Sequence, residues 1–152
     1  MTVASPLFLV LSSVPYWKCN ADQMVIAIAG SHVRSSDPYA SESKLPILLS
    51  NIKAMPKEIE VHLAAFHPPF QKRHSKTAES VYYANTCAEC DANFGDFFLF
   101  SEPEGAFFPF DEEQAKAINI MELPFDGEFD FRCQCHANNE LIFAHAERVD
   151  SA

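Results

Sequence analysis

The sequence is poor in glycine and lacks several patterns that identify common classes of protein. Only 4 of its 152 residues are glycine, whereas 14 are phenylalanine. It contains no G-x-G-x-x-G, G-x-S-x-G or H-E-x-x-H motif, so nothing points to a dinucleotide fold, a serine hydrolase or a zinc protease. It has no internal repeat, and no apolar run approaches the roughly 20 residues of a membrane-spanning helix. We therefore expect no membrane partner.

Length and composition predict a single domain over residues 1–152. Hydrophobic residues make up 48% of the chain, which is enough to form a core. Five cysteines cannot form an even disulfide framework, and this favours a reducing, cytoplasmic location. The apolar run at residues 6–11 is short and has no basic residues before it, so we expect a first β-strand rather than a signal peptide.

The net charge of −10 is concentrated in one part of the chain. Residues 89–130 contain twelve acidic residues and one basic residue, Lys116. Such a surface repels nucleic acid, which makes nucleic acid an unlikely partner. The same segment contains the adjacent pairs Phe97-Phe98 and Phe107-Phe108, and in a strand one member of each pair faces away from the core. An exposed aromatic beside carboxylates is an anchor for a basic protein partner, although a second layer of packing explains these residues equally well. We expect the carboxylates of residues 101–130 to cover one contiguous face.

Local patterns predict an α+β fold of mostly antiparallel strands, with two or three short helices on one side and a zinc-ribbon-like hairpin. Residues 6–29 are expected to form strands interrupted at Pro15. The apolar positions of residues 46–54 have helical spacing, whereas residues 57–66 fit either a helix or a strand.

The second half of the chain has one clear helix signal. Asp111 is a predicted N-cap, with Gln114 at the reciprocal position of a capping box. Residues 129–133 and 141–145 are expected to form two closing strands.

A C-x-x-C pair, Cys87 and Cys90, lies between two apolar stretches. This arrangement is typical of a zinc knuckle, in which two thiolates on a turn between strands bind one metal ion. We expect the turn to connect strands at residues 82–85 and 96–100. A tetrahedral zinc ion needs two further ligands.

The early cysteine, Cys19, lies in a similar context, but Asp22 stands where a second cysteine would complete the motif. Because zinc accepts carboxylate oxygen, Cys19, Asp22, Cys87 and Cys90 form a candidate zinc site. Two alternatives stay open at this point. Three thiolates with a histidine could bind the metal, or the ribbon could have lost its zinc, with Cys19 a core thiol and Asp22 a turn residue.

A second group of soft ligands is Cys133, Cys135 and His136. In a strand, the two cysteines face the same side. They could form a second metal site or a redox dithiol, but two packed or partly exposed thiols are the simpler interpretation.

Several of these runs resemble a family of uncharacterised bacterial proteins. The resemblance is carried by Y-W-K-C at residues 16–19, A-N-T-C-A-E-C at 84–90, G-D-F-F-L at 95–99 and E-P-E-G-A-F-F-P at 102–109. It covers most of residues 14–110 and, more faintly, 141–146. Members typically have a paired cysteine motif after the Trp-Lys, and this chain departs from that pattern at Asp22. The resemblance implies a bacterial cytoplasmic origin and a zinc-ribbon-like element, and it implies no activity.

Three functions are compatible with these features. The leading hypothesis is a non-enzymatic, acidic module that binds a basic protein, in the manner of an immunity protein or inhibitor. The second is a zinc-ribbon accessory of nucleic-acid machinery, which requires a segregated basic face around Lys53, Lys57, Lys72, Arg73 and Lys76. The third is a thiol- or metal-dependent enzyme.

Overall fold

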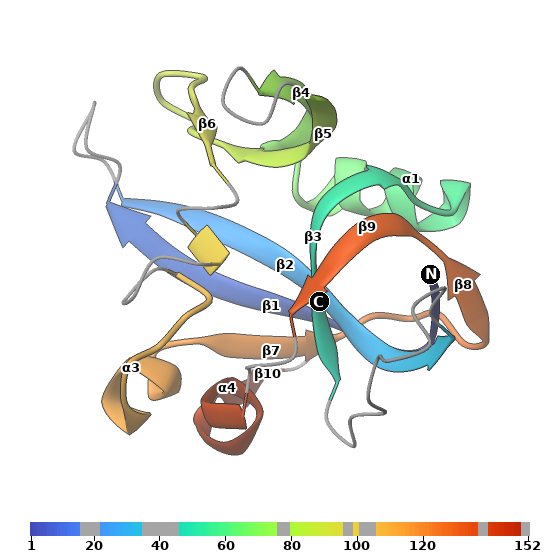
Figure 1. Cartoon of the computed structure of the whole chain (residues 1–152). Coiled ribbons are helices and arrows are strands. Elements are labelled where there is room, and N and C mark those ends of the chain that lie inside the picture. Colours follow the sequence, from blue (N-terminus) through green and yellow to red (C-terminus); the bar gives the residue numbers. More distant parts are fainter. Residues whose placement is uncertain are drawn as a thin grey trace.

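The computed structural model describes residues 1–15, 22–34, 46–75, 80–95, 99–100, 106–136 and 140–149 (Figure 1). These residues form a strongly curved sheet with short helices packed against it. The strands are β1 Thr2–Pro15, β2 Asp22–Arg34, β3 Ile47–Ala54, β4 Phe70–Ser75, β5 Ser80–Thr86, β6 Asn93–Phe94, β7 Asn119–Glu122, β8 Glu128–Asp130, β9 Arg132–His136 and β10 Glu147–Val149. The helices are α1 Lys57–Phe66, α3 Glu112–Lys116 and α4 Glu140–His145.

The sheet follows the order β10-β7-β1-β2-β3-β5-β4, with β6 added to β5, β8 to β1 and β9 to β3. Strands β10 and β7 run parallel, and the other pairings among the described strands are antiparallel. The α+β class with mostly antiparallel strands is therefore confirmed.

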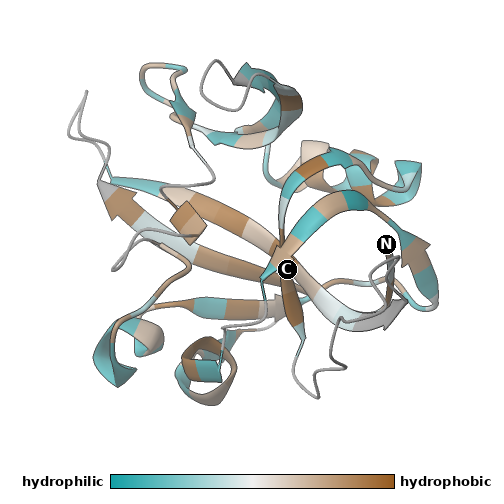
Figure 2. Ribbon diagram, viewed as in Figure 1, coloured by the Kyte–Doolittle hydropathy of each residue, from teal (hydrophilic) through white to brown (hydrophobic). Residues whose placement is uncertain are grey.

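The long hairpin of β1 and β2 forms the centre of the sheet and has hydrophobic residues along both strands (Figure 2). The predicted strands of residues 6–29 are confirmed, with β1 ending at Pro15. Residues on β1 alternate between two clusters of buried side chains, with Leu9 in one cluster and Val10 in the other. Both faces of the hairpin are therefore covered by packed side chains.

The helices lie on both faces of the sheet, which corrects the expectation that they share one side. Ile59 and Leu63 of α1 pack in the first cluster, which also contains Leu9, whereas Ile142 of α4 packs in the second. No helix in the described part of the chain is long and apolar enough to cross a membrane.

Residues 46–54, predicted as a helix, form the strand β3. The sequence from Ile47 to Ser50 is buried on both faces, because Ile47 and Leu49 pack in the first cluster and Leu48 packs in the second. A strand buried on both faces has a continuous apolar run, which periodicity cannot distinguish from a buried helix. Asn51 has a φ of 48°, and the pairing with β9 shifts register between Ser50 and Ala54.

Two further segments settle or correct the sequence predictions. Residues 57–66, left open between helix and strand, form α1. Residues 129–133 are largely extended, in β8 and β9, but residues 141–145 were predicted as a strand and lie in α4. Helix α4 has six residues, of which Ile142 is buried against the sheet.

Candidate functional site

Cys87 and Cys90 lie on a tight turn between the antiparallel strands β5 and β6, as predicted. The Cys87 amide donates to the Ala92 carbonyl and the Asp91 amide donates to the Cys87 carbonyl, both at 2.8 Å. Asp91 has a φ of 62°, a left-handed conformation that aspartate tolerates better than most residues. The second predicted strand, at residues 96–100, is wrong at its end: β6 stops at Phe94, residues 99–100 are helical, and residues 96–98 lie outside the described part of the chain.

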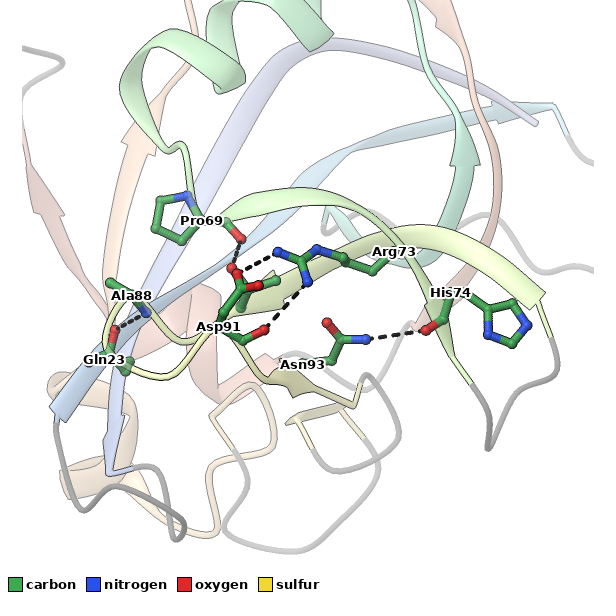
Figure 3. A network of polar contacts seen from close by, with 8 residues as sticks. Gln23, Pro69, Arg73, His74, Ala88, Asp91 and Asn93 are labelled. Atoms are coloured by element: carbon green, nitrogen blue, oxygen red, sulfur yellow. Dashed lines mark hydrogen bonds and ion pairs between the residues drawn. The ribbon is translucent and has the colours of Figure 1, made fainter.

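Polar contacts from neighbouring strands hold this turn in place (Figure 3). The Arg73 guanidinium of β4 forms an ion pair with the Asp91 carboxylate at 2.5 Å, and this pairing lowers the pKa of Asp91. The Thr86 hydroxyl donates to the Pro69 carbonyl at 2.6 Å. The Ala88 amide donates to Gln23 Oε1 at 3.0 Å, so the beginning of β2 lies against the turn.

A buried amide connects the same hairpin to the central strands. Asn85 Oδ1 accepts from the Ile26 amide at 2.8 Å, and Asn85 Nδ2 donates to the Ile26 carbonyl at 3.0 Å. The Asn85 side chain thus forms with Ile26 the two backbone hydrogen bonds that a paired strand would otherwise provide. It fixes β5, and with it the cysteine turn, against β2.

The structure places three of the four predicted zinc ligands. Cys87 is buried among apolar side chains, Cys90 is exposed, and Asp22 is exposed at the first position of β2, next to Gln23. Cys19 lies outside the described residues. Among the residues that are described, no three Cys, His, Asp or Glu side chains gather in a way that could hold a metal ion. The four-ligand site therefore stays a prediction.

Cys133, Cys135 and His136 lie on β9, which pairs with β3. Burial raises the pKa of the Cys133 thiol to about 12 and also raises that of Cys135, so few thiolates exist at neutral pH. His136 Nε2 lies 2.8 Å from the hydroxyl of Ser50, and the imidazole stacks on Phe100. Burial lowers the pKa of His136, which keeps it neutral. Cys133 is partly buried and Cys135 is exposed, which fits the interpretation as packed or partly exposed thiols.

An exposed aromatic stands beside a group of carboxylates near α3. Phe110 is 71% exposed, the largest value among the exposed large hydrophobic side chains of the described residues. Asp111 accepts from the Gln114 amide at 2.9 Å, and Gln114 Oε1 accepts from the Phe110 amide, so the predicted N-cap of α3 is confirmed. The capping bonds fix the backbone on both sides of the exposed ring.

Helix α4 extends this acidic surface because it packs beside α3 (Figure 1). His145 Nε2 of α4 lies 3.6 Å from a carboxylate oxygen of Glu112, and Lys116 lies 3.6 Å from Glu113. We use the term Phe110 surface for this ring and the exposed carboxylates of the adjoining α3, α4 and β10 segments, namely Asp111, Glu112, Glu113, Glu140 and Glu147.

The described carboxylates of residues 101–130 do not cover one contiguous face. Helix α3 is followed directly by β7, whose Asn119 pairs with Leu11 of β1, whereas Asp130 of β8 pairs with Thr2 at the other end of β1. At about 3.3 Å per residue these positions are roughly 25–30 Å apart. Figure 1 shows α3 and β8 on opposite sides of the molecule. The carboxylates of α3 therefore do not share a face with those of β8.

The basic residues of the nucleic-acid hypothesis do not form a free basic face in the described part of the chain. Lys57 is paired with Glu60 at 3.3 Å, and Arg73 is paired with Asp91. Lys72 and Arg73 are adjacent on β4 and therefore point to opposite sides of the strand. Lys76 lies outside the described residues.

Sequence reasoning missed a group of polar side chains between α1 and β5. The Tyr83 hydroxyl donates to Glu60 Oε2 at 2.6 Å, and the Lys72 ammonium lies 5.6 Å from the centre of the Tyr83 ring. Glu60 and Tyr83 are 23 positions apart, and no local pattern signals their contact. The contact depends on α1 packing beside the hairpin of β4 and β5, which the sequence pattern does not indicate.

Comparison of the chain with protein-family models, with curated proteins and with solved structures finds no match.

Proposed function

We propose that this protein is a non-enzymatic, acidic protein-binding module that recognises a basic protein partner through the Phe110 surface. The observation that carries the proposal is the exposure of Phe110, at 71%, on a backbone fixed by the capping bonds of α3. An aromatic side chain on a backbone that is already fixed loses no backbone freedom on binding, which favours it as an interface anchor.

The charges around Phe110 support a basic partner. Five exposed carboxylates lie on the segment that follows Phe110 and on the neighbouring α4 and β10, and two cations, Lys116 and Arg148, lie on the same segments. Lys116 is partly neutralised by Glu113, and Arg148 lies over the rings of Phe8 and Phe143. The remaining negative potential accelerates association with a positively charged protein and disfavours acidic ones. Neutralising a basic toxin or nuclease is a function that fits this chemistry.

In the same proposal, a zinc-ribbon-like element stabilises the fold away from the binding surface. Two observations support it: Cys87 and Cys90 share one turn, and Gln23, next to Asp22, contacts that turn. Cys19 is three residues before Asp22 in the sequence. Thiolate and carboxylate ligands suit zinc, which would crosslink the β2 and β5 ends of the sheet.

We also propose a cytoplasmic location. The four cysteines in the described part of the chain are free thiols, which fits a reducing compartment.

Affinity capture from an extract of the native host tests the proposal. The wild-type chain should retain at low salt a protein of net positive charge and release it at high salt. Phe110→Ala and the double variant Glu112→Gln/Glu113→Gln should lose that protein. Phe66→Ala and Glu128→Gln are matched controls, because Phe66 is 58% exposed on α1 and Glu128 is exposed on β8. Equal capture by the wild type and the Phe110 variant would refute the proposal.

A further inference from the structure

An open cavity of about 320 Å³ lies between α1 and the hairpin of β4 and β5, away from the Phe110 surface. Its volume is within the range of small-molecule sites. Met55, Leu63 and Phe70 give it apolar walls, and Ala64 lies at its edge on the exposed side of α1. The cavity is accessible from solvent, and Leu63 and Phe70, at 2% and 8% exposed, each present a small apolar area to a ligand.

The acidic group that lines the cavity already has partners. Glu60 Oε2 accepts from the Tyr83 hydroxyl at 2.6 Å, and Glu60 Oε1 lies 3.3 Å from the Lys57 ammonium. These hydrogen bonds lower the pKa of Glu60, so it stays ionised and engaged. A ligand cation would have to compete with both partners for this carboxylate.

The basic residue that lines the cavity, Lys72, is exposed to solvent. Its ammonium lies over the Tyr83 ring. Within the described residues, it forms no ion pair with a carboxylate. Of the described residues that line the cavity, Lys72 and Glu60 are the charged ones, and the positive charge of Lys72 contributes to the lowered pKa of Glu60. The cation at the edge of an apolar cavity is the group best placed to meet a ligand.

We propose that this cavity binds a small monocarboxylate with an apolar body. The carboxylate pairs with the Lys72 ammonium, and the apolar body packs against Met55, Leu63 and Phe70. The site is independent of the protein-binding function proposed above.

Binding of octanoate to the full chain, measured by calorimetry, tests this proposal, with octan-1-ol and octylammonium as probes of the same length. We expect octanoate to bind most tightly. Lys72→Met keeps the alkyl stem and should weaken octanoate binding about fivefold to tenfold while leaving octanol unchanged. Lys53→Met is the matched control, because Lys53 is exposed on β3 and does not line the cavity.

A second pair of variants tests the location. Ala64→Trp should fill the cavity and abolish binding, whereas Ala65→Trp, on the next exposed position of α1, should leave it intact. Thermal melts of both variants verify that they fold. The proposal is overturned if the wild type does not bind octanoate, if octylammonium binds more tightly, or if Lys72→Met and Ala64→Trp bind like their controls.

Discussion

Replacing Asn85 by alanine should destabilise the protein far more than the loss of one polar side chain suggests. Asn85 is 3% exposed, and its amide forms both a donor and an acceptor bond with the backbone of Ile26. The variant leaves the N–H and the C=O of a buried residue without these partners. Because each unsatisfied buried group costs about 1–3 kcal/mol, we expect a loss of about 2–4 kcal/mol after partial relaxation.

Urea denaturation of the wild type and the variant measures this loss. An unchanged slope of the unfolding free energy against urea concentration would show that both proteins expose the same surface on unfolding. Asn93→Ala is the control, because Asn93 bonds the His74 carbonyl at 3.3 Å on an exposed part of the same hairpin, and it should cost within about 0.5 kcal/mol. Since Asn85 fixes the cysteine turn to β2, the Cys87 thiol should also react faster with a thiol reagent in the variant. A loss below about 1 kcal/mol, or one equal to that of Asn93→Ala, would refute this reasoning.

Three further predictions concern the thiols and two titrating groups. If zinc holds the turn, a chelator and Cys87→Ser should each lower the melting temperature markedly; without zinc, the chelator has no effect and the substitution costs about 1–3 kcal/mol. The lowered pKa of Asp91 contributes stability that is present above the usual aspartate pKa and is lost as pH falls through the folded-state value, so Arg73→Met should flatten the acid limb of a stability–pH curve. The pKa of Tyr83, raised to about 12 by burial and by Glu60, contributes stability that is lost as pH rises from about 10 through 12. An ultraviolet titration should show a late-titrating tyrosine that Glu60→Gln shifts to lower pH.

Local patterns were sufficient for the parts of the fold that local chemistry determines. The N-cap of α3 depends on Asp111 and Gln114, three residues apart, and the turn at Cys87 and Cys90 lies within one hairpin. Both were predicted correctly. β3 was predicted as a helix because burial on both faces removes the alternation that identifies a strand.

The candidate site depended more strongly on tertiary structure. Arg73 and Asp91 are 18 positions apart, and Asn85 and Ile26 are 59 apart, so only the paired strands bring them together. The negative charge of residues 89–130 was evident in the sequence. Its division between α3 and β8 was not, because it depends on β7, which follows α3, and β8 pairing with different parts of β1. The sequence likewise could not show that Phe110 is exposed, because this depends on which of its many phenylalanines the core encloses.

Site-specific photo-cross-linking in the native host tests the central claim most directly. A photoreactive phenylalanine analogue at position 110 should cross-link to one basic protein, because the ring at that position lies in the proposed interface. The same analogue at position 66, where Phe66 is comparably exposed but lies on α1, should not give that product. A cross-link from position 66 but not from position 110, or to the same protein from both, would contradict the account.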